Sequence, residues 1–488
     1  MSITKPFRSI LQVRRQSFEK GSFISNVCNN KYVLVIGSEV ILDKEKHAAD
    51  NGDIQQYILS RLNEALGRDE NPYPNLNALV AARPAVSTEE EASGADLIRN
   101  LLIPSTISEE DDPGEDEGSY ITANDLSPEL IGLLDTRLFR FVMTTSIDNN
   151  VEFIMRSIWK EQLRVVNFAD QDDWKKFQKE IEETLDRTDY THTTYKYTTP
   201  TLIYVFGKVT NDHSKNFMKT ENDAIEFIDR WMNRHDPFTV LIKEKRMLAL
   251  GCKFDDWYFR FFWFILKRDF NKLGDGEVAF SLDSEKPEDQ KLKHYLERKH
   301  VFIHDDARKF MQSICNMLNP DNNNPDSRAF HEIIKSKRGE GEIFLSYCSQ
   351  DFILASQIFF RLTNLGYSVW FDNEKLCGGN YEVDIRQAIH KAKVVLTLLT
   401  PAIQKDLENG VLTRFYQKEW RMASEIGNER IIPLAADGYS LRGSYHSRQE
   451  GDTTILETYE EIIGRPISGI DLMTDGFDKL VNIINNKK

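Results

Sequence analysis

One acidic side chain stands where the surrounding pattern predicts a hydrophobic residue. The stretch Leu412–Ile426 has the apolar period of an amphipathic helix, and Leu412, Phe415, Met422 and Ile426 project within a narrow arc of that helix. Glu419 falls in the middle of the arc. One interpretation is a buried carboxylate that neighbouring donors satisfy; the other is an acid held in a cleft for chemistry. The pattern alone leaves both open.

The segments around Glu419 predict the sheet that must position it. Short apolar runs and amphipathic stretches alternate after residue 341, which is typical of a parallel-sheet domain. The strands expected are Glu342–Tyr347, Tyr367–Asp372, Val394–Thr400 and Arg430–Leu434. The helices expected are Phe352–Leu365, one around Ile385–Ala392, Leu412–Ile426 and Phe477–Ile484.

The same alternation occurs earlier in the chain. Compact apolar runs that suit buried parallel strands are Tyr32–Gly37, Phe141–Thr145, Leu202–Gly207 and Met247–Gly251. Helical periods lie between and after them, for example Asp223–Asn233 and Trp257–Lys267. We therefore expect an α/β protein with two doubly wound parallel-sheet domains, each with its ligand edge at the carboxyl ends of the strands.

Two polar segments punctuate the chain. Within Glu109–Glu117 seven of nine residues are acidic, so we expect a solvated acidic loop at about residues 83–120. The Asn- and Pro-rich stretch that begins at Asn319 predicts an interdomain linker. The expected organisation is a first domain of residues 1–318, a linker of residues 319–340 and a second domain of residues 341–488.

Composition narrows the class of protein. The 488 residues carry a net charge of −15, which argues against a nucleic-acid backbone or an anionic membrane as the main partner. The most apolar window, Trp257–Leu266, contains Arg260 and is shorter than the ~20 residues that span a bilayer. The five cysteines have no metal-type spacing and suit reduced thiols of a cytoplasmic protein. They are Cys28, Cys252, Cys315, Cys348 and Cys377.

Three motifs in order resemble the Toll/interleukin receptor (TIR) domain. They are EIFLSYCSQD (Glu342–Asp351), YSVWFDNEKLCGGN (Tyr367–Asn380) and YQKEW (Tyr416–Trp420). The resemblance implies a flavodoxin-like fold from about Glu342 to the C-terminus. Many TIR domains cleave NAD⁺ at the nicotinamide–ribose bond with a catalytic glutamate, and Glu419 occupies the matching position.

The resemblance also implies how the site works. NAD⁺ would be the substrate, with no metal and no further cofactor, because a fixed carboxylate stabilises the oxocarbenium-like ribose left by neutral nicotinamide. The loop after the second motif often packs against another protomer, which implies activity gated by assembly. The residues that the resemblance assigns to substrate binding are Ser346, Tyr347, Trp370, Asp372, Lys375, Gly378 and Gly379.

The first domain resembles sirtuins over about residues 20–318. The resemblance rests on YVLVIGSEV, TTSID, YVFG and GCKFDDWYFRFFW. Ser146 replaces the usual Asn, Phe206 replaces the usual His, and Glu39 would repel a dinucleotide's phosphates. Asp148 and the pair before Trp257 remain, and His213 lies in a polar loop. We therefore interpret this domain as catalytically inactive, reused for assembly or sensing.

The combined resemblance predicts a cytoplasmic bacterial antiphage effector that depletes NAD⁺. Homo-oligomers would form through both domains, and a phage-derived or host protein would serve as the trigger. The products would be nicotinamide and ADP-ribose or its cyclic isomer. Two alternatives stay open: a non-catalytic TIR adaptor or scaffold, and a nucleotide sensor that uses the sirtuin-like pocket.

Overall fold

The computed structural model contains two compact units. One is formed by residues 30–312, and the other joins the first helix, α2 (Lys20–Cys28), to the chain from Ser313 onward. The residues that the structure describes are 20–65, 121–186, 194–210 without 196, 217–254 without 219, 233–236 and 243–244, 256–269, 277–279, 287–298, 302–319 without 305, 328–334 without 329, 341–371, 381–409, 414–436 and 475–486, with isolated positions 76, 97, 98, 102 and 439.

A seven-stranded parallel sheet organises the first unit. Its order is β3-β6-β2-β1-β7-β8-β9: the chain goes from β1 to β2 and the edge strand β3, returns to insert β6, and then crosses to β7, β8 and β9 on the other side of β1. The strands are β1 (Tyr32–Ile36), β2 (Phe141–Thr144), β3 (Arg164–Asn167), β6 (Thr201–Tyr204), β7 (Arg246–Leu250), β8 (Glu277–Ala279) and β9 (Phe302–His304). A separate antiparallel pair joins β4 (Leu185–Asp186) to β5 (Thr194–Tyr195).

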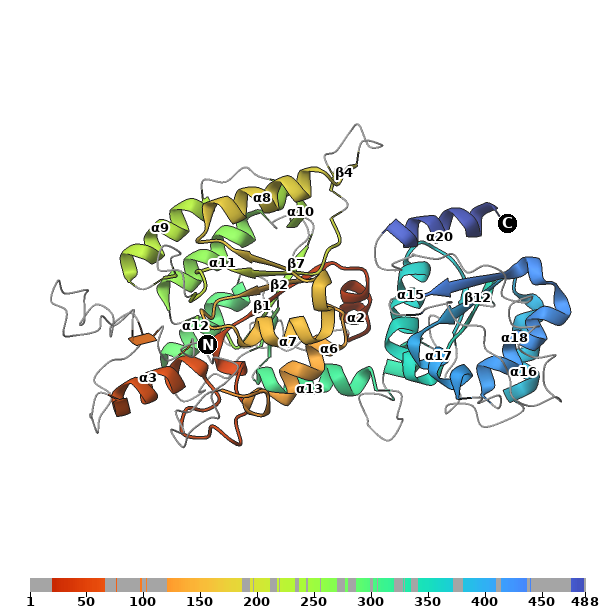
Figure 1. The fold of residues 1–488 in the computed structure, drawn as a ribbon, viewed down its shortest axis with the longest axis horizontal. Coiled ribbons are helices and arrows are strands. Elements are labelled where there is room, and N and C mark those ends of the chain that lie inside the picture. Colours follow the sequence, from red (N-terminus) through yellow and green to blue (C-terminus); the bar gives the residue numbers. More distant parts are fainter. Residues whose placement is uncertain are drawn as a thin grey trace, which may run out of the picture. The chain divides into compact units, whose positions relative to one another are not determined.

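Helices cover both faces of this sheet, which explains why its central strands are apolar throughout. All five residues of β1 are buried. In Figure 1, α8 to α11 lie over one face and α3, α6, α7 and α13 lie over the other. The helices are α3 (Ile54–Ala65), α6 (Pro128–Asp135), α7 (Asn150–Trp159), α8 (Gln171–Glu182), α9 (Glu221–Met232), α10 (Pro237–Ile242), α11 (Trp257–Asp269), α12 (Pro287–Arg298) and α13 (Ala307–Met317).

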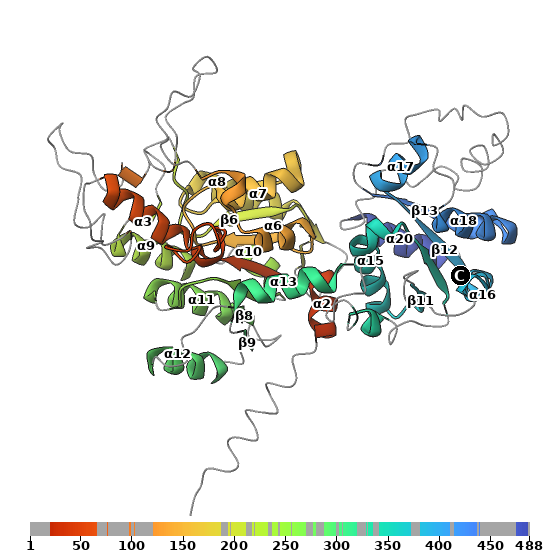
Figure 2. The same cartoon turned by 90° about the horizontal axis from the view of Figure 1, so that it is seen from below.

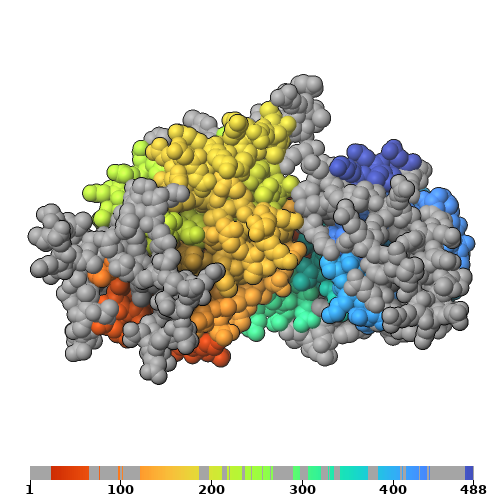
Figure 3. All heavy atoms as spheres, in the orientation of Figure 1, coloured from red at the N-terminus to blue at the C-terminus, as the bar shows by residue number. Residues whose placement is uncertain are grey.

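The core between the sheet and α8 to α11 is rich in aromatic rings. Trp231 on α9 stacks on Phe168 at 4.2 Å between ring centroids and meets Phe262 of α11 edge-on at 5.2 Å. In the space-filling view of Figure 3, the residues coloured orange to yellow, which include α6, α7 and α8, form one continuous surface of this unit. On the side of the aromatic core, α8 and its neighbours α9 to α11 shield the rings from water.

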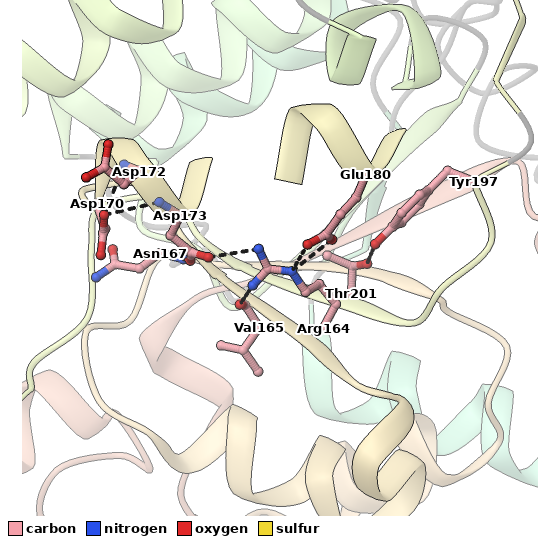
Figure 4. Close-up of polar contacts among 9 residues, drawn as sticks. All are labelled: Arg164, Val165, Asn167, Asp170, Asp172, Asp173, Glu180, Tyr197 and Thr201. Carbon is pink, nitrogen blue, oxygen red and sulfur yellow. Dashed lines mark hydrogen bonds and ion pairs between the residues drawn. The ribbon is translucent and has the colours of Figure 1, made fainter. Parts of the chain in front are cut away.

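A half-buried ion-pair cluster fastens α8 to the edge strand β3 (Figure 4). The guanidinium of Arg164 donates to Asp173 Oδ1 at 2.8 Å and to both carboxylate oxygens of Glu180 at 3.2 and 3.0 Å. Its third nitrogen donates to the carbonyl of Val165 at 2.6 Å. Asp173 also accepts from the backbone N–H of Asn167 at 2.8 Å. Every charge in the cluster therefore has a partner.

The second unit has a four-stranded parallel sheet in the order β11-β10-β12-β13. Its strands are β10 (Ile343–Ser346), β11 (Val369–Trp370), β12 (Val394–Leu399) and β13 (Ile431–Ala435). Its helices are α15 (Phe352–Asn364), α16 (Tyr381–Lys391), α17 (Pro401–Glu408), α18 (Phe415–Ile426) and α20 (Asp475–Asn486). Residues of α16, α17 and α18 share one core with the sheet. Arg361 of α15 lies 3.8 Å from the ring centroid of Phe477 on α20.

A helix from the start of the chain completes the second unit. α2 packs beside α15 (Figures 1 and 2), and its apolar stripe is buried. Phe330 adds a second cover, since its ring centroid lies 5.9 Å from that of Phe360 and 6.0 Å from that of Phe352, both on α15. The expected first domain of residues 1–318 includes α2, whereas the structure groups α2 with the second unit. The reason is that this short helix buries its apolar stripe against α15.

The prediction of two doubly wound parallel sheets is confirmed. Strands β1, β2, β6, β7 and all four strands of the second sheet lie where the apolar runs predicted them. Strands β3, β8 and β9 and helix α17 were not predicted. The acidic loop of residues 83–120 lies outside the described residues, apart from isolated positions. None of the described helices is long and apolar enough to cross a membrane.

Substituting Arg164 by Met should destabilise the first unit by about 2 kcal/mol, because Asp173 and Glu180 would keep their charges without the guanidinium. Urea denaturation followed by tryptophan fluorescence measures the loss. Lys175→Met, on α8, the helix that carries Asp173 and Glu180, is the matched control. Its ion pair with Asp172 spans 3.8 Å between largely exposed side chains, so the change should stay within about 0.5 kcal/mol. Equal losses in both variants would contradict the structural role of the cluster.

Candidate functional site

The strand order of the second unit points to one edge of the sheet. The chain passes from β10 to the edge strand β11 and then crosses back to β12 on the other side of β10. In open α/β sheets, ligands bind outside the carboxyl ends of the strands at such a reversal. The residues that follow β10 and β12 therefore define the candidate site.

Ser346 and Glu419 meet at this edge. Ser346 ends β10, and its hydroxyl donates to Glu419 Oε2 at 2.5 Å. The serine is 1% exposed and the glutamate 8% exposed. Glu419 therefore does point inward from the apolar face of its helix, and the Ser346 hydroxyl at the end of the strand orients one of its carboxylate oxygens. A short hydrogen bond to a charged acceptor is among the stronger kinds.

The helix that carries Glu419 is fixed at its start. Arg414 is the residue before α18, and its guanidinium pairs with both carboxylate oxygens of Asp406 on α17, at 3.0 and 3.2 Å. One turn before Glu419, the ring of Tyr416 packs on Trp420 at 4.9 Å, and its hydroxyl lies 3.4 Å from Asp406 Oδ2. These contacts set the position and rotation of α18.

A second acid lies at the same edge. Asp351 follows β10, and its Oδ2 accepts from the hydroxyl of Thr400, the residue after β12, at 2.6 Å. Burial raises the pKa of Asp351 from 3.8 to about 6; the Thr400 hydrogen bond opposes that rise and the charge of Asp406 adds to it. Asp351 is therefore partly protonated in neutral solution, unlike an ordinary aspartate.

Two neighbouring groups are held neutral. Burial raises the pKa of the Cys348 thiol, and the charges of Asp351 and Asp406 raise it further. Burial and Asp406 likewise raise the pKa of Tyr416 far above its ordinary value. A thiol with a raised pKa is a poor nucleophile at neutral pH. The carboxylates, not the cysteine, are therefore the candidate reactive groups of this edge.

The structure separates the predicted binding residues. Trp370 packs against the core that contains α18, so it shares the face of Glu419. Tyr347 points to the opposite face, where its ring stacks on Phe371 at 5.0 Å beside α15. The ring of Tyr347 is thus held in packing, away from Ser346. The remaining predictions, Asp372, Lys375, Gly378 and Gly379, lie outside the described residues.

The corresponding edge of the first unit is closed by its own backbone. The N–H of Gly37 donates to the carbonyl of Leu250 at 2.9 Å, and the N–H of Glu39 donates to that of Gly251 at 3.2 Å. A Cβ on Gly37 would lie 2.0 Å from the carbonyl oxygen of Gly251, so only glycine fits there. Two of the N–H groups that would bind a phosphate after β1 are therefore already used.

Side chains fill the neighbouring part of that edge. Ser146 donates to Asp148 in a short hydrogen bond, and Phe206 is 1% exposed within an aromatic cluster. Glu152 is bound by Lys208 at 2.6 Å and by Arg156 at 2.8 Å. Burial would raise the pKa of Glu152, but these two cations more than offset that effect and lower it. Glu152 is therefore fully paired with cations and serves as a structural contact between α7 and the segment after β6.

Sequence reasoning missed Asp351, Thr400, Asp406 and Arg414. The signal for Asp351 was available, because it lies within the first TIR-like motif, just beyond a predicted strand that ends at the ligand edge. Asp406 gave no signal because α17, the helix that carries it, was not predicted, and no sequence pattern pairs Asp406 with Arg414. Among the described residues, no group of three or more His, Cys, Asp or Glu side chains could hold a metal ion.

Comparison with protein families identifies the second unit. Residues 343–461 match the family of the TIR domain, so the chain carries a C-terminal TIR domain. The match begins at β10 and includes Glu419. Nothing identifies the N-terminal unit as sirtuin-like, and that resemblance stays a prediction. No curated protein is detectably similar to the chain.

Replacing Asp351 by Asn should stabilise the second unit at pH 8 by roughly 1–3 kcal/mol. Because the folded-state pKa lies above 3.8, the folded protein keeps a proton between about pH 4 and pH 6 that the unfolded chain has lost. The wild-type carboxyl therefore costs increasing stability as the pH rises through that window. The amide has no such cost and can still accept from Thr400.

Urea denaturation at pH 4, 6 and 8 measures the difference between the two proteins. The stabilisation should shrink to a small fraction at pH 4, where the carboxyl is protonated in the folded state and partly protonated in the unfolded chain. Asp384→Asn, on the exposed face of α16, removes one negative charge without burial and is the control. A gain that is independent of pH would contradict the raised pKa of Asp351.

Proposed function

We propose that the TIR domain of this chain is an NAD⁺ hydrolase that cleaves the bond between nicotinamide and ribose. The observation that carries the proposal is the buried carboxylate of Glu419, oriented by Ser346 at the carboxyl edge where the strand order reverses. A buried acid whose orientation is fixed by a hydroxyl at a ligand edge is more than helix packing requires.

The chemistry suits one oriented carboxylate. As the C1′–N bond of NAD⁺ breaks, the bonding electrons leave with nicotinamide, which becomes neutral and needs no proton. Positive charge then develops on C1′ and the ring oxygen of the ribose. The carboxylate of Glu419 stabilises that charge in a site of low dielectric, where its effect is largest. Water completes hydrolysis to ADP-ribose.

Ser346 would act by orienting Glu419. Its hydroxyl donates to Oε2 and thereby fixes the orientation of the whole carboxylate, including Oε1, before the substrate binds. The alternative, in which this edge only mediates contacts between TIR domains, needs no oriented carboxylate. We therefore place the adaptor function second.

The N-terminal unit would control the TIR domain without chemistry of its own. If it is sirtuin-like, the closed turn at Gly37 and the buried Phe206 support a catalytically inactive form. Its role would then be to hold a homo-oligomer or to detect a protein trigger. Such a protein suits a defence effector that depletes cytoplasmic NAD⁺ once it assembles.

Substituting Glu419 by Gln should lower NAD⁺ consumption by about 100-fold or more, because the neutral amide cannot stabilise the developing cation. Purified full-length protein is assayed for nicotinamide release across a range of protein concentrations. Turnover that rises more than linearly with concentration would support gating by assembly.

Glu425→Gln is the matched control on the same helix. Glu425 is exposed and its oxygen lies 3.6 Å from Arg386, so wild-type turnover is expected. Equal turnover in wild type and Glu419→Gln would contradict the proposal. If wild type leaves NAD⁺ intact at every concentration and with phage lysate added, the adaptor function is favoured.

Substituting Ser346 by Ala should lower turnover by about 10- to 100-fold, which corresponds to losing a hydrogen bond to a charged group of about 1.5–3 kcal/mol. The loss should fall mainly on kcat, since the carboxylate remains but is less well oriented. Ser349→Ala, an exposed serine three residues on, should behave as wild type. A Ser346→Ala protein with wild-type kcat would contradict the orienting role.

A further inference from the structure

The side chain of Asp351 does not cap the helix that it precedes. Asp351 is the residue before α15, where an aspartate side chain normally accepts hydrogen bonds from the first turn of the helix. Here the side chain makes no such bond. It turns instead across the carboxyl edge of the sheet to Thr400. The usual structural reason for an aspartate at this position is absent.

The contact with Thr400 holds one oxygen of Asp351 and leaves the other open. The Thr400 hydroxyl donates to Oδ2 at 2.6 Å and accepts from the backbone N–H of Ile403 at 3.3 Å, so its own orientation is fixed. Within the described part of the chain, Oδ1 of Asp351 makes no hydrogen bond. The open oxygen belongs to a carboxyl that joins the ends of β10 and β12, the two strands at which the order reverses.

The two acids of this edge have different surroundings. Glu419 is oriented by Ser346 from β10, whereas Asp351 is oriented by Thr400 and faces a further carboxylate, Asp406. Asp406 is itself neutralised by Arg414. When two carboxyl groups at one ligand edge have different hydrogen-bond partners, the roles of charge stabiliser and proton acceptor can be divided between them.

We propose that Asp351 is the general base of the hydrolysis, accepting the proton of the water that attacks C1′. This inference rests on the proposed NAD⁺ hydrolase function. The C1′–N bond breaks first and its electrons leave with nicotinamide. A water oxygen then forms the C1′–O bond, the water proton passes to Oδ1 of Asp351, and Asp351 later releases it to solvent. The balance is NAD⁺ and water to nicotinamide, ADP-ribose and one proton.

This assignment separates two reactions that share their first step. Hydrolysis needs a base, because the attacking water must lose a proton. Exchange of nicotinamide for a substituted pyridine needs none, because a neutral ring nitrogen attacks C1′ without losing a proton. Glu419 should be required for both reactions and Asp351 only for hydrolysis.

The experiment supplies full-length protein with NAD⁺ and a substituted pyridine and quantifies ADP-ribose and the exchanged dinucleotide by chromatography. In Asp351→Asn, hydrolysis should fall by about 100-fold, while exchange should change by no more than about twofold. Glu419→Gln should lose both. An equal loss of both reactions in Asp351→Asn, or unchanged hydrolysis, would overturn the assignment.

Thr400 offers an independent measurement that leaves the carboxyl in place. Cys348 from its own loop and Asp406 from α17 lie close to Asp351, and Asp406 is in turn contacted by Arg414 and Tyr416 at the start of α18. With these unchanged, the rate of hydrolysis in wild type should fall as the pH drops through about 6, while exchange should not. The Thr400 hydrogen bond lowers the pKa of Asp351, so Thr400→Val should move that fall to higher pH.

Thr400→Ser keeps the hydroxyl and should keep the wild-type profile. A hydrolysis profile that is the same in wild type and Thr400→Val would overturn the assignment of Asp351. Failure of the proposed function would give a different result. In that case neither hydrolysis nor exchange would differ between wild type and Glu419→Gln, whether or not the wild type consumes NAD⁺.

Discussion

The cost of burying a carboxylate constrains the whole second unit. An acid on the inner face of an amphipathic helix is tolerated only if donors reach it and the helix cannot rotate. Ser346 supplies the donor at 2.5 Å, and the pairing of Arg414 with Asp406 fixes the start of the helix. The parallel sheet brings these residues together, because its strands all end at one edge. Glu419 therefore depends on strands and helices from three separate parts of the sequence.

Both sheets could be predicted from the sequence because buried parallel strands are short, apolar and closed by turn residues. Glu419 could be predicted because a charge within an apolar arc is a strong anomaly. Strands β3, β8 and β9 were not predicted because polar residues interrupt them: β3 begins with Arg164, which belongs to an ion-pair cluster, β8 begins with Glu277 and β9 ends with His304. The partners of Asp351 and Arg414 could not be predicted, because side-chain pairing across a sheet edge leaves no periodic pattern in the sequence.

The two units treat the same architectural edge in opposite ways. In the first unit the turn after β1 donates its N–H groups to the carbonyls of Leu250 and Gly251, and Glu152 is neutralised by two cations. In the second unit Asp351 retains an oxygen that no described residue occupies, and its pKa is raised to about 6. Saturated hydrogen bonding suits a rigid support, whereas unsaturated and perturbed groups suit reactivity.

The packing of α2 against α15 bears on how the protein is made. The helix of residues 20–28 leaves the ribosome long before Phe352 begins the helix that it covers. A nine-residue helix has little stability alone, so its apolar stripe must wait, unfolded or shielded, through synthesis of the entire first unit. The C-terminal unit is consequently completed only after α15 and the strands that follow it have been synthesised. A product terminated before Phe352 would carry α2 without the helix that covers its apolar stripe.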